Sequence, residues 1–111
     1  MEFEVSSEAR DGVVLVRVRG DVDLATAPRL DEVLTACWQP SARLVIDATD
    51  IPFMDSTGLG VLVKAAVRAR EAGGSVALVA VASRVRKVLA ITGLDTHLAI
   101  YDTVADAVRA T

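Results

Sequence analysis

One stretch of the sequence decides the fold: Phe53-Met54-Asp55-Ser56-Thr57-Gly58-Leu59-Gly60-Val61-Leu62-Val63. The segment before it, Arg43-Leu44-Val45-Ile46-Asp47, is a short apolar run typical of a buried strand. From Leu59 onward, apolar residues recur at the spacing of a helix. The polar residues between them are therefore predicted to form an exposed turn that presents free backbone N–H groups to an anion. A serine in such a turn is well placed to receive a phosphate, so the turn indicates a regulatory switch operated by phosphorylation.

The composition sets limits on the class of protein. The chain has 111 residues, which fits a single domain over residues 1–111, and it is 52% hydrophobic and 24% charged, as globular proteins are. Its formal net charge of −3 argues against nucleic-acid binding, which needs a basic surface to neutralise phosphates. No apolar run approaches the ~18 residues of a membrane span. The N-terminus lacks the regions of a signal peptide, and the single cysteine, Cys37, leaves no internal disulfide. We therefore expect a cytoplasmic protein that works away from membranes.

Strand patterns and turn residues predict a sheet opened by a hairpin. Strands are expected over residues 2–6 and 13–19, joined by a turn at Asp11-Gly12. Three further strands are expected over residues 43–47, 76–81 and 98–100. Val14, Val16 and Val18 should lie on one face of the second strand, while the other face is half solvated.

Helices are predicted between the later strands. We expect them from a Thr26 cap to about Cys37, from the polar turn to about Ala72, from a Ser83 cap to Gly93, and after a capping box of Thr103 and Asp106. The order is ββαβαβαβα. Because strands separated by helices run parallel, the fold class is α/β, with a mixed β-sheet and an antiparallel N-terminal hairpin.

Motifs for catalysis or cofactor binding are incomplete. His97 and Cys37 are single residues of their kinds, so no zinc-ligand spacing exists. Ser56 lacks the Gly-x-Ser-x-Gly elbow of a hydrolase. Gly58 and Gly60 begin a dinucleotide-binding fingerprint, but Val63 stands where its third small residue belongs. The sequence therefore predicts no metal, no cofactor and no enzyme, with a hydrolase using Ser56 as a remote third hypothesis.

Several residues are open to a structural interpretation. Asp, Ser and Thr cap helices without any regulatory role. We interpret Trp38 as a packing residue, and we expect Phe53 and Met54 to fill the core beneath the turn. Gly58 and Gly60 are costly in a helix, which fits either a close approach by a partner or close packing within the chain. We interpret six basic residues as solvated helix faces, namely Lys64, Arg68, Arg70, Arg84, Arg86 and Lys87.

Two segments together resemble the paired signatures of bacterial anti-sigma factor antagonists, which are single STAS domains. They are Gly20-Asp21-Val22-Asp23-Leu24-Ala25-Thr26-Ala27-Pro28 and residues 53–61 of the stretch above. The resemblance covers essentially the whole chain, including Ile91-Thr92-Gly93-Leu94. It implies a small mixed sheet with helices packed mainly on one face.

The same resemblance implies a phosphorylation switch. In the family, the unphosphorylated antagonist binds an anti-sigma factor, which is a serine kinase using ATP, and the sigma factor is released. The kinase then phosphorylates the serine that matches Ser56, the complex dissociates, and a serine phosphatase resets the system. Thr57 is the fallback acceptor. The implied partner-binding residues are Asp21, Asp23, Asp55, Thr57, Gly58, Leu59 and Gly60. The alternative is a STAS subunit of another assembly, such as a lipid-transport complex or a stress-sensing scaffold.

Overall fold

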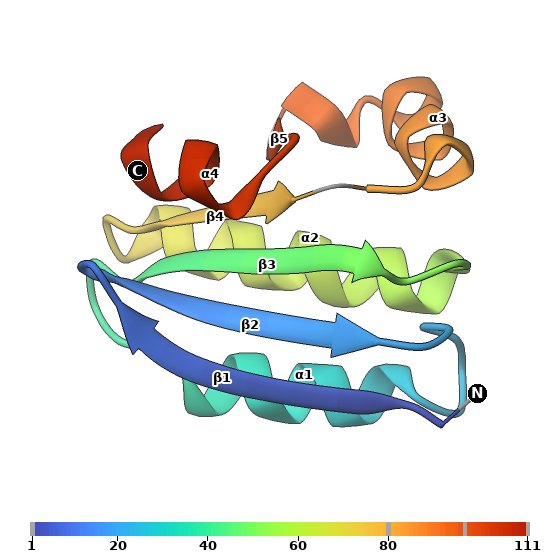
Figure 1. The fold of residues 1–111 in the computed structure, drawn as a ribbon, viewed down its shortest axis with the longest axis horizontal. Coiled ribbons are helices and arrows are strands. Elements are labelled where there is room, and N and C mark those ends of the chain that lie inside the picture. Colours follow the sequence, from blue (N-terminus) through green and yellow to red (C-terminus); the bar gives the residue numbers. More distant parts are fainter. Residues whose placement is uncertain (1, 80, 97, 111) are drawn as a thin grey trace.

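The strands form one sheet in the order β1-β2-β3-β4-β5, as the computed structural model shows for residues 2–79, 81–96 and 98–110 (Figure 1). The strands are β1 (Glu4–Arg10), β2 (Val13–Arg19), β3 (Arg43–Asp50), β4 (Ser75–Val79) and β5 (Ala99–Tyr101). β1 pairs with β2 in the antiparallel sense, and every later pair is parallel. The predicted mixed sheet and the order ββαβαβαβα are confirmed, with one added 3₁₀ helix, η1 (Leu94–Thr96).

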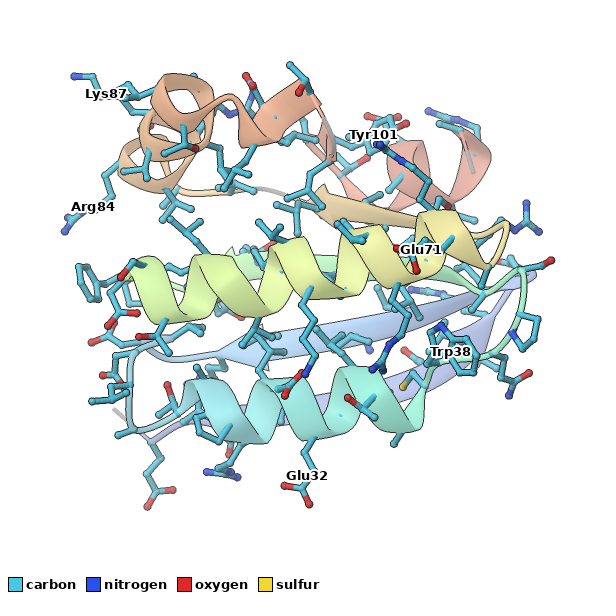
Figure 2. The ribbon with its side chains drawn as sticks, turned by 180° about the vertical axis from the view of Figure 1, so that it is seen from behind. Glu32, Trp38, Glu71, Arg84, Lys87 and Tyr101 are labelled. Carbon is cyan, nitrogen blue, oxygen red and sulfur yellow. The ribbon has the colours of Figure 1, made fainter. Side chains whose placement is uncertain are left out.

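Helices cover the sheet unequally. α1 (Ala27–Ala36) and α2 (Ser56–Glu71) lie side by side on one face, as Figures 1 and 2 show. α3 (Ser83–Thr92) adds Val85 and Leu89 to the same core, whereas α4 (Val104–Ala110) packs Ala107 on the opposite face. The expectation that the helices lie mainly on one face is therefore confirmed. Among the helices that the structure describes, none has the length and apolar character needed to cross a bilayer.

The alternation of side chains along β2 builds two apolar layers. Val16 and Val18 are buried in the larger core, beneath α1 and α2. Leu15 faces the other way and is buried against α4. Further along that second face, Arg17 and Arg19 are exposed and form ion pairs with glutamates of β1. The second face is therefore half solvated, as the sequence predicted.

The predicted bounds of several strands were wrong by a few residues. β1 runs from Glu4 to Arg10 rather than over residues 2–6, because pairing with β2 continues up to the turn at Asp11 and Gly12. Almost all of β1 is exposed, so its own sequence carries little apolar signal. β3 extends to Asp50, and β5 begins at Ala99. β4 begins at Ser75 and ends at Val79, while Ala80 lies outside the described residues.

Of the predicted helix caps, the one at Thr26 is confirmed in position only, and the one at Ser83 was wrong. Thr26 occupies the cap position of α1, but its side chain makes no capping hydrogen bond. Ser83 is the first residue of α3, whose cap position is held by Ala82. At α4 the expected contact does form, since the Asp106 N–H donates to Thr103 Oγ1 at 3.1 Å. Gly93 ends α3 with a φ of 78°, as predicted.

Candidate functional site

The loop after β2 and the turn after β3 meet at one edge of the sheet. β2 and β3 are parallel neighbours, so both end at the same edge (Figure 1). Val22 and Met54 form an isolated parallel bridge there. The Val22 N–H donates to the Phe53 carbonyl at 3.0 Å, and the Asp55 N–H donates to the Val22 carbonyl at 3.1 Å. The two segments that carry the predicted site residues are therefore joined through their backbones.

Asp55 caps α2 at this edge. Its backbone is extended, and its Oδ1 accepts hydrogen bonds from the N–H groups of Thr57 at 2.9 Å and Gly58 at 3.1 Å. Two of the helix N–H groups that would otherwise lack a partner are satisfied in this way. Asp55 is half-buried. The sequence assigned its carboxylate to partner binding, and through these hydrogen bonds the same carboxylate holds the start of the helix in place.

Ser56 is the first residue of α2, and it is exposed. Because Asp55 supplies the cap, the Ser56 hydroxyl is not needed for the capping of its own helix. Thr57 is half-buried, so its hydroxyl is less accessible than that of Ser56. The turn thus presents one exposed hydroxyl at the start of a 16-residue helix. The prediction that the turn offers free backbone N–H groups to an anion was wrong for Thr57 and Gly58, because the Asp55 carboxylate already accepts from both.

Asp23 organises the neighbouring loop. It is half-buried, and its Oδ1 accepts from the N–H groups of Ala25 at 3.0 Å and Thr26 at 3.1 Å. The Thr26 hydroxyl in turn donates to the carbonyl of Asp21, whose side chain is exposed. Asp23 therefore lies on the loop that adjoins Ser56, but its carboxylate holds the loop in shape. The roles of Asp21 and Asp23 in partner binding stay predictions.

The two glycines of the motif have different surroundings. A Cβ on Gly58 would lie 2.7 Å from both Met54 Cγ and Val22 Cγ1, so the absence of a side chain permits the two loops to meet. A Cβ on Gly60 would meet nothing within 4 Å. Close packing therefore accounts for Gly58, and it does not account for Gly60. Leu59 between them is buried in the core.

Two apolar side chains near Ser56 are exposed. Met54 is buried as predicted, but Phe53 is exposed, so the expectation that both residues plug the core was wrong for Phe53. Phe53 directly precedes Met54, the residue of the β-bridge, and consecutive side chains of strand-like backbone point to opposite sides. Leu24, on the other loop, is also exposed, and the sequence analysis missed it. A leucine directly between Asp23 and Ala25, outside any periodic apolar pattern, was the available signal.

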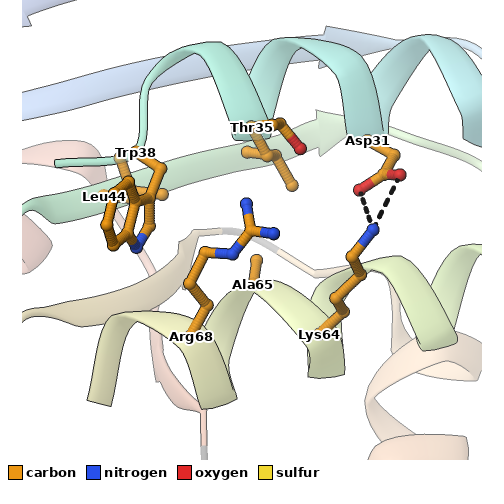
Figure 3. A pocket seen from close by; sticks show the side chains of 8 residues that line it. Asp31, Thr35, Trp38, Leu44, Lys64, Ala65 and Arg68 are labelled. Carbon is orange, nitrogen blue, oxygen red and sulfur yellow. Dashed lines mark hydrogen bonds and ion pairs between the residues drawn. The ribbon is translucent and has the colours of Figure 1, made fainter. Parts of the chain in front are cut away.

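The interpretation of the basic residues as solvated helix faces is confirmed for the exposed ones, but Arg68 is half-buried. Lys64 on α2 pairs with Asp31 on α1 at 3.1 Å, and the guanidinium of Arg68 lies 5.8 Å from the centre of the Trp38 ring (Figure 3). The hollow that these residues line is about 10 Å³, room for little more than one water molecule. Arg84 and Lys87 point away from the body of the protein on α3 (Figure 2). Trp38 thus packs on Arg68 at the seam between α1 and α2.

Metal chemistry has no support in the described part of the chain. No group of three or more His, Cys, Asp or Glu side chains there is arranged to hold a metal ion. Cys37 is a half-buried free thiol, and His97, interpreted above as a lone residue, lies outside the described residues.

Comparison with known proteins gives a consistent result. The STAS domain family model matches residues 4–107. The chain is 34% identical to the anti-sigma-B factor antagonist of Bacillus subtilis, over 85% of this chain and 86% of that protein. It is 30% identical to the anti-sigma-B factor antagonist of Staphylococcus aureus, over 85% and 88% of the two chains. The crystal structure of an anti-sigma factor antagonist from Mycobacterium paratuberculosis superposes with a TM-score of 0.88 at 33% identity, covering 98% of this chain and 93% of that one.

Proposed function

The chain belongs to the STAS domain family, and from this we propose that it is an anti-sigma factor antagonist that is switched by phosphorylation of Ser56. In its unmodified form it binds an anti-sigma factor serine kinase and thereby releases the sigma factor. The kinase uses ATP to phosphorylate Ser56, and the complex then dissociates. The observation that carries the proposal is the exposed Ser56 hydroxyl, which opens α2 while Asp55 does the capping.

The role is that of a binding partner and kinase substrate. The chain needs no cofactor for it, because the kinase supplies the ATP. A serine phosphatase restores the unmodified form. Since the kinase, the phosphatase and the sigma factor meet ATP and RNA polymerase in the cytoplasm, we place the chain there too, acting through proteins rather than through nucleic acid or membranes.

The electrostatic free energy of a phosphate at the joined loops is large enough to change the affinity for a partner. A phosphoserine carries about −1.5 to −2 charges at neutral pH. A unit charge ~6 Å from another costs about 3 kcal/mol at an effective dielectric of ~20. Asp55 and Asp23 repel the phosphate in the free and the bound chain alike, so the affinity falls by this amount where an acidic group of the partner faces the joined loops at that distance. Three kcal/mol corresponds to roughly a hundredfold in affinity.

The decisive experiment maps the modification. Each anti-sigma factor kinase encoded in the source genome is incubated with the chain and ATP, and the products are analysed by phosphopeptide mass spectrometry. We expect one phosphate on Ser56. The Ser56→Ala variant should bind the kinase with unchanged affinity and accept no phosphate. A phosphate on Thr57 or elsewhere, with Ser56 unmodified, contradicts the assignment. If no kinase binds or modifies the chain, the alternative of a STAS subunit in another assembly is favoured.

A further inference from the structure

Two exposed apolar side chains lie on the joined loops, close in sequence to the bridge that connects them. Leu24 is 76% exposed and Phe53 is 41% exposed. Phe53 immediately precedes Met54, and its carbonyl accepts the hydrogen bond from Val22. Leu24 and Ser56 each lie two residues beyond the Val22–Met54 pair. The phosphate acceptor is therefore accompanied by an apolar side chain from each of the two loops.

The fold gives no reason for either side chain to be apolar. Neither Leu24 nor Phe53 belongs to the two core clusters that the described residues form. The charged residues beside these side chains are acidic: Asp21 and Asp50 are exposed, and the Gly20 N–H donates to the Asp50 carbonyl at 3.0 Å. Phenylalanine is enriched at protein interfaces, and a partner that covered both side chains would remove their apolar surface from water.

We infer that Leu24 and Phe53 are the apolar anchors of the kinase contact, and that their burial removes water from Ser56 and so makes the contact intolerant of phosphate. The inference rests on the proposed function. The occupant is the kinase surface that receives Ser56, with an apolar recess for the two anchors and cationic groups opposite the surrounding aspartates. A second copy of this chain fits worse, because a two-fold contact would bring these acidic loops against each other.

The anchors determine which physical effect ends the binding. Repulsion between a phosphate and nearby carboxylates is weakened by salt at exposed sites. The cost of stripping water from a dianion beside apolar side chains is not weakened in this way, and it rises as the contact becomes drier. With both anchors in place, the loss of affinity on phosphorylation should therefore persist at high salt.

The test compares serine substitutions at the anchors with matched substitutions elsewhere. Leu24→Ser and Phe53→Ser remove the anchors. Val67→Ser is one control, since Val67 is 50% exposed on α2 and lies eleven residues, or about 16 Å, beyond Ser56. Trp38→Ser is the aromatic control, since Trp38 is 40% exposed and packs on Arg68, farther along the same helix. Leu24→Met keeps an apolar side chain at the first anchor.

The measurement is the dissociation constant for the kinase that modifies the chain, determined for the unmodified and the Ser56-phosphorylated forms at low and high salt. Each anchor variant should raise the dissociation constant of the unmodified complex at least tenfold. It should also lower the ratio of the phosphorylated to the unmodified dissociation constant at least threefold. Both controls, and Leu24→Met, should stay within twofold of the wild type. Circular dichroism should show a native spectrum for every variant used.

The outcomes separate the inference from the function on which it rests. If the kinase binds and modifies the wild type but both anchor variants bind within twofold of it, the inference is overturned and the proposed function stands. If no kinase binds or modifies the wild type, both fall. If sedimentation shows that the wild type self-associates and the anchor variants do not, the occupant is a second copy, and the assignment to the kinase is wrong.

Discussion

Adding one methyl group at Gly58 or at Gly60 should have opposite effects on stability, although both glycines lie in the same helix. Alanine is favoured over glycine within a helix by up to about 1 kcal/mol. At Gly60 the new methyl group meets nothing within 4 Å, so Gly60→Ala should gain most of that amount. At Gly58 it would stand 2.7 Å from Val22 Cγ1 and Met54 Cγ, and 3.1 Å from the Val22 carbonyl oxygen.

The clash at Gly58 should outweigh the gain in helix propensity. Val22 is fully buried, so its side chain has little freedom to move aside. Overpacking of this kind costs about 1–3 kcal/mol. After subtraction of the propensity gain, Gly58→Ala should destabilise the chain by up to about 2 kcal/mol. The two variants should therefore differ by about 1–3 kcal/mol, at roughly 4 °C in melting temperature per kcal/mol for a domain of this size.

Urea unfolding followed by circular dichroism measures this difference directly, with each alanine variant serving as the control for the other. Equal stabilities for Gly58→Ala and Gly60→Ala would refute the explanation based on close packing at the bridge. Kinase binding adds a second comparison. If a partner approaches the bare backbone at Gly60, Gly60→Ala should be more stable and yet bind more weakly, whereas unchanged affinity would exclude that approach.

Three further predictions concern the polar residues of the joined loops. Asp55→Ala removes the acceptor of two helix N–H groups and should lower the free energy of unfolding by about 1 kcal/mol, measured by thermal unfolding. Asp55→Asn should lose less stability, because its amide oxygen can still accept these hydrogen bonds. Equal losses of stability in the two variants would contradict the capping role. Asp23→Ala should lower stability by about 1 kcal/mol through lost hydrogen bonds to Ala25 and Thr26, whereas Asp23→Asn should keep them. A fall in kinase affinity in the asparagine variant without a loss of stability would therefore report the charge itself, and unchanged affinity in both variants would remove Asp23 from the contact. Ser56→Glu should keep the native circular-dichroism spectrum and melting temperature while binding the kinase at least tenfold more weakly, and a molten spectrum would count against a switch confined to the surface.

The order of the elements could be predicted from the sequence because it depends on local periodicity. The apolar run from Arg43 to Asp47 and the helical spacing after Leu59 are visible within a few residues, and both elements form. The two loops meet because β2 and β3 are neighbouring parallel strands that end at the same edge. β1 was misjudged because its pairing is imposed by β2 rather than by its own exposed residues.

Contacts between segments could not be predicted in the same way. Thr26 has the chemistry of a cap, but its hydroxyl is committed to the Asp21 carbonyl. The exposure of Phe53 depends on which of two consecutive residues faces the core at the bridge, and a shift of one position exchanges the two sides. Leu24 lies in a loop, where no periodicity indicates burial or exposure. Thr26 is thus decided by a hydrogen bond within its own loop, Phe53 by which of two neighbouring residues faces the core, and Leu24 by the path of a loop without periodicity.

The structure divides the residues of the site between holding the fold and offering a surface. Asp55 caps α2, Gly58 permits the bridge, and Leu59 fills the core, so much of the motif maintains the turn itself. Because Asp55 already occupies the N–H groups of Thr57 and Gly58, a phosphate on Ser56 does not find them free. To take them, it would have to displace a carboxylate that is bound at 2.9 Å and 3.1 Å. In the switch that we propose, a phosphate on Ser56 would therefore lie on the outer side of the turn, where its charge would weaken a contact with a partner and leave the helix beneath it unchanged.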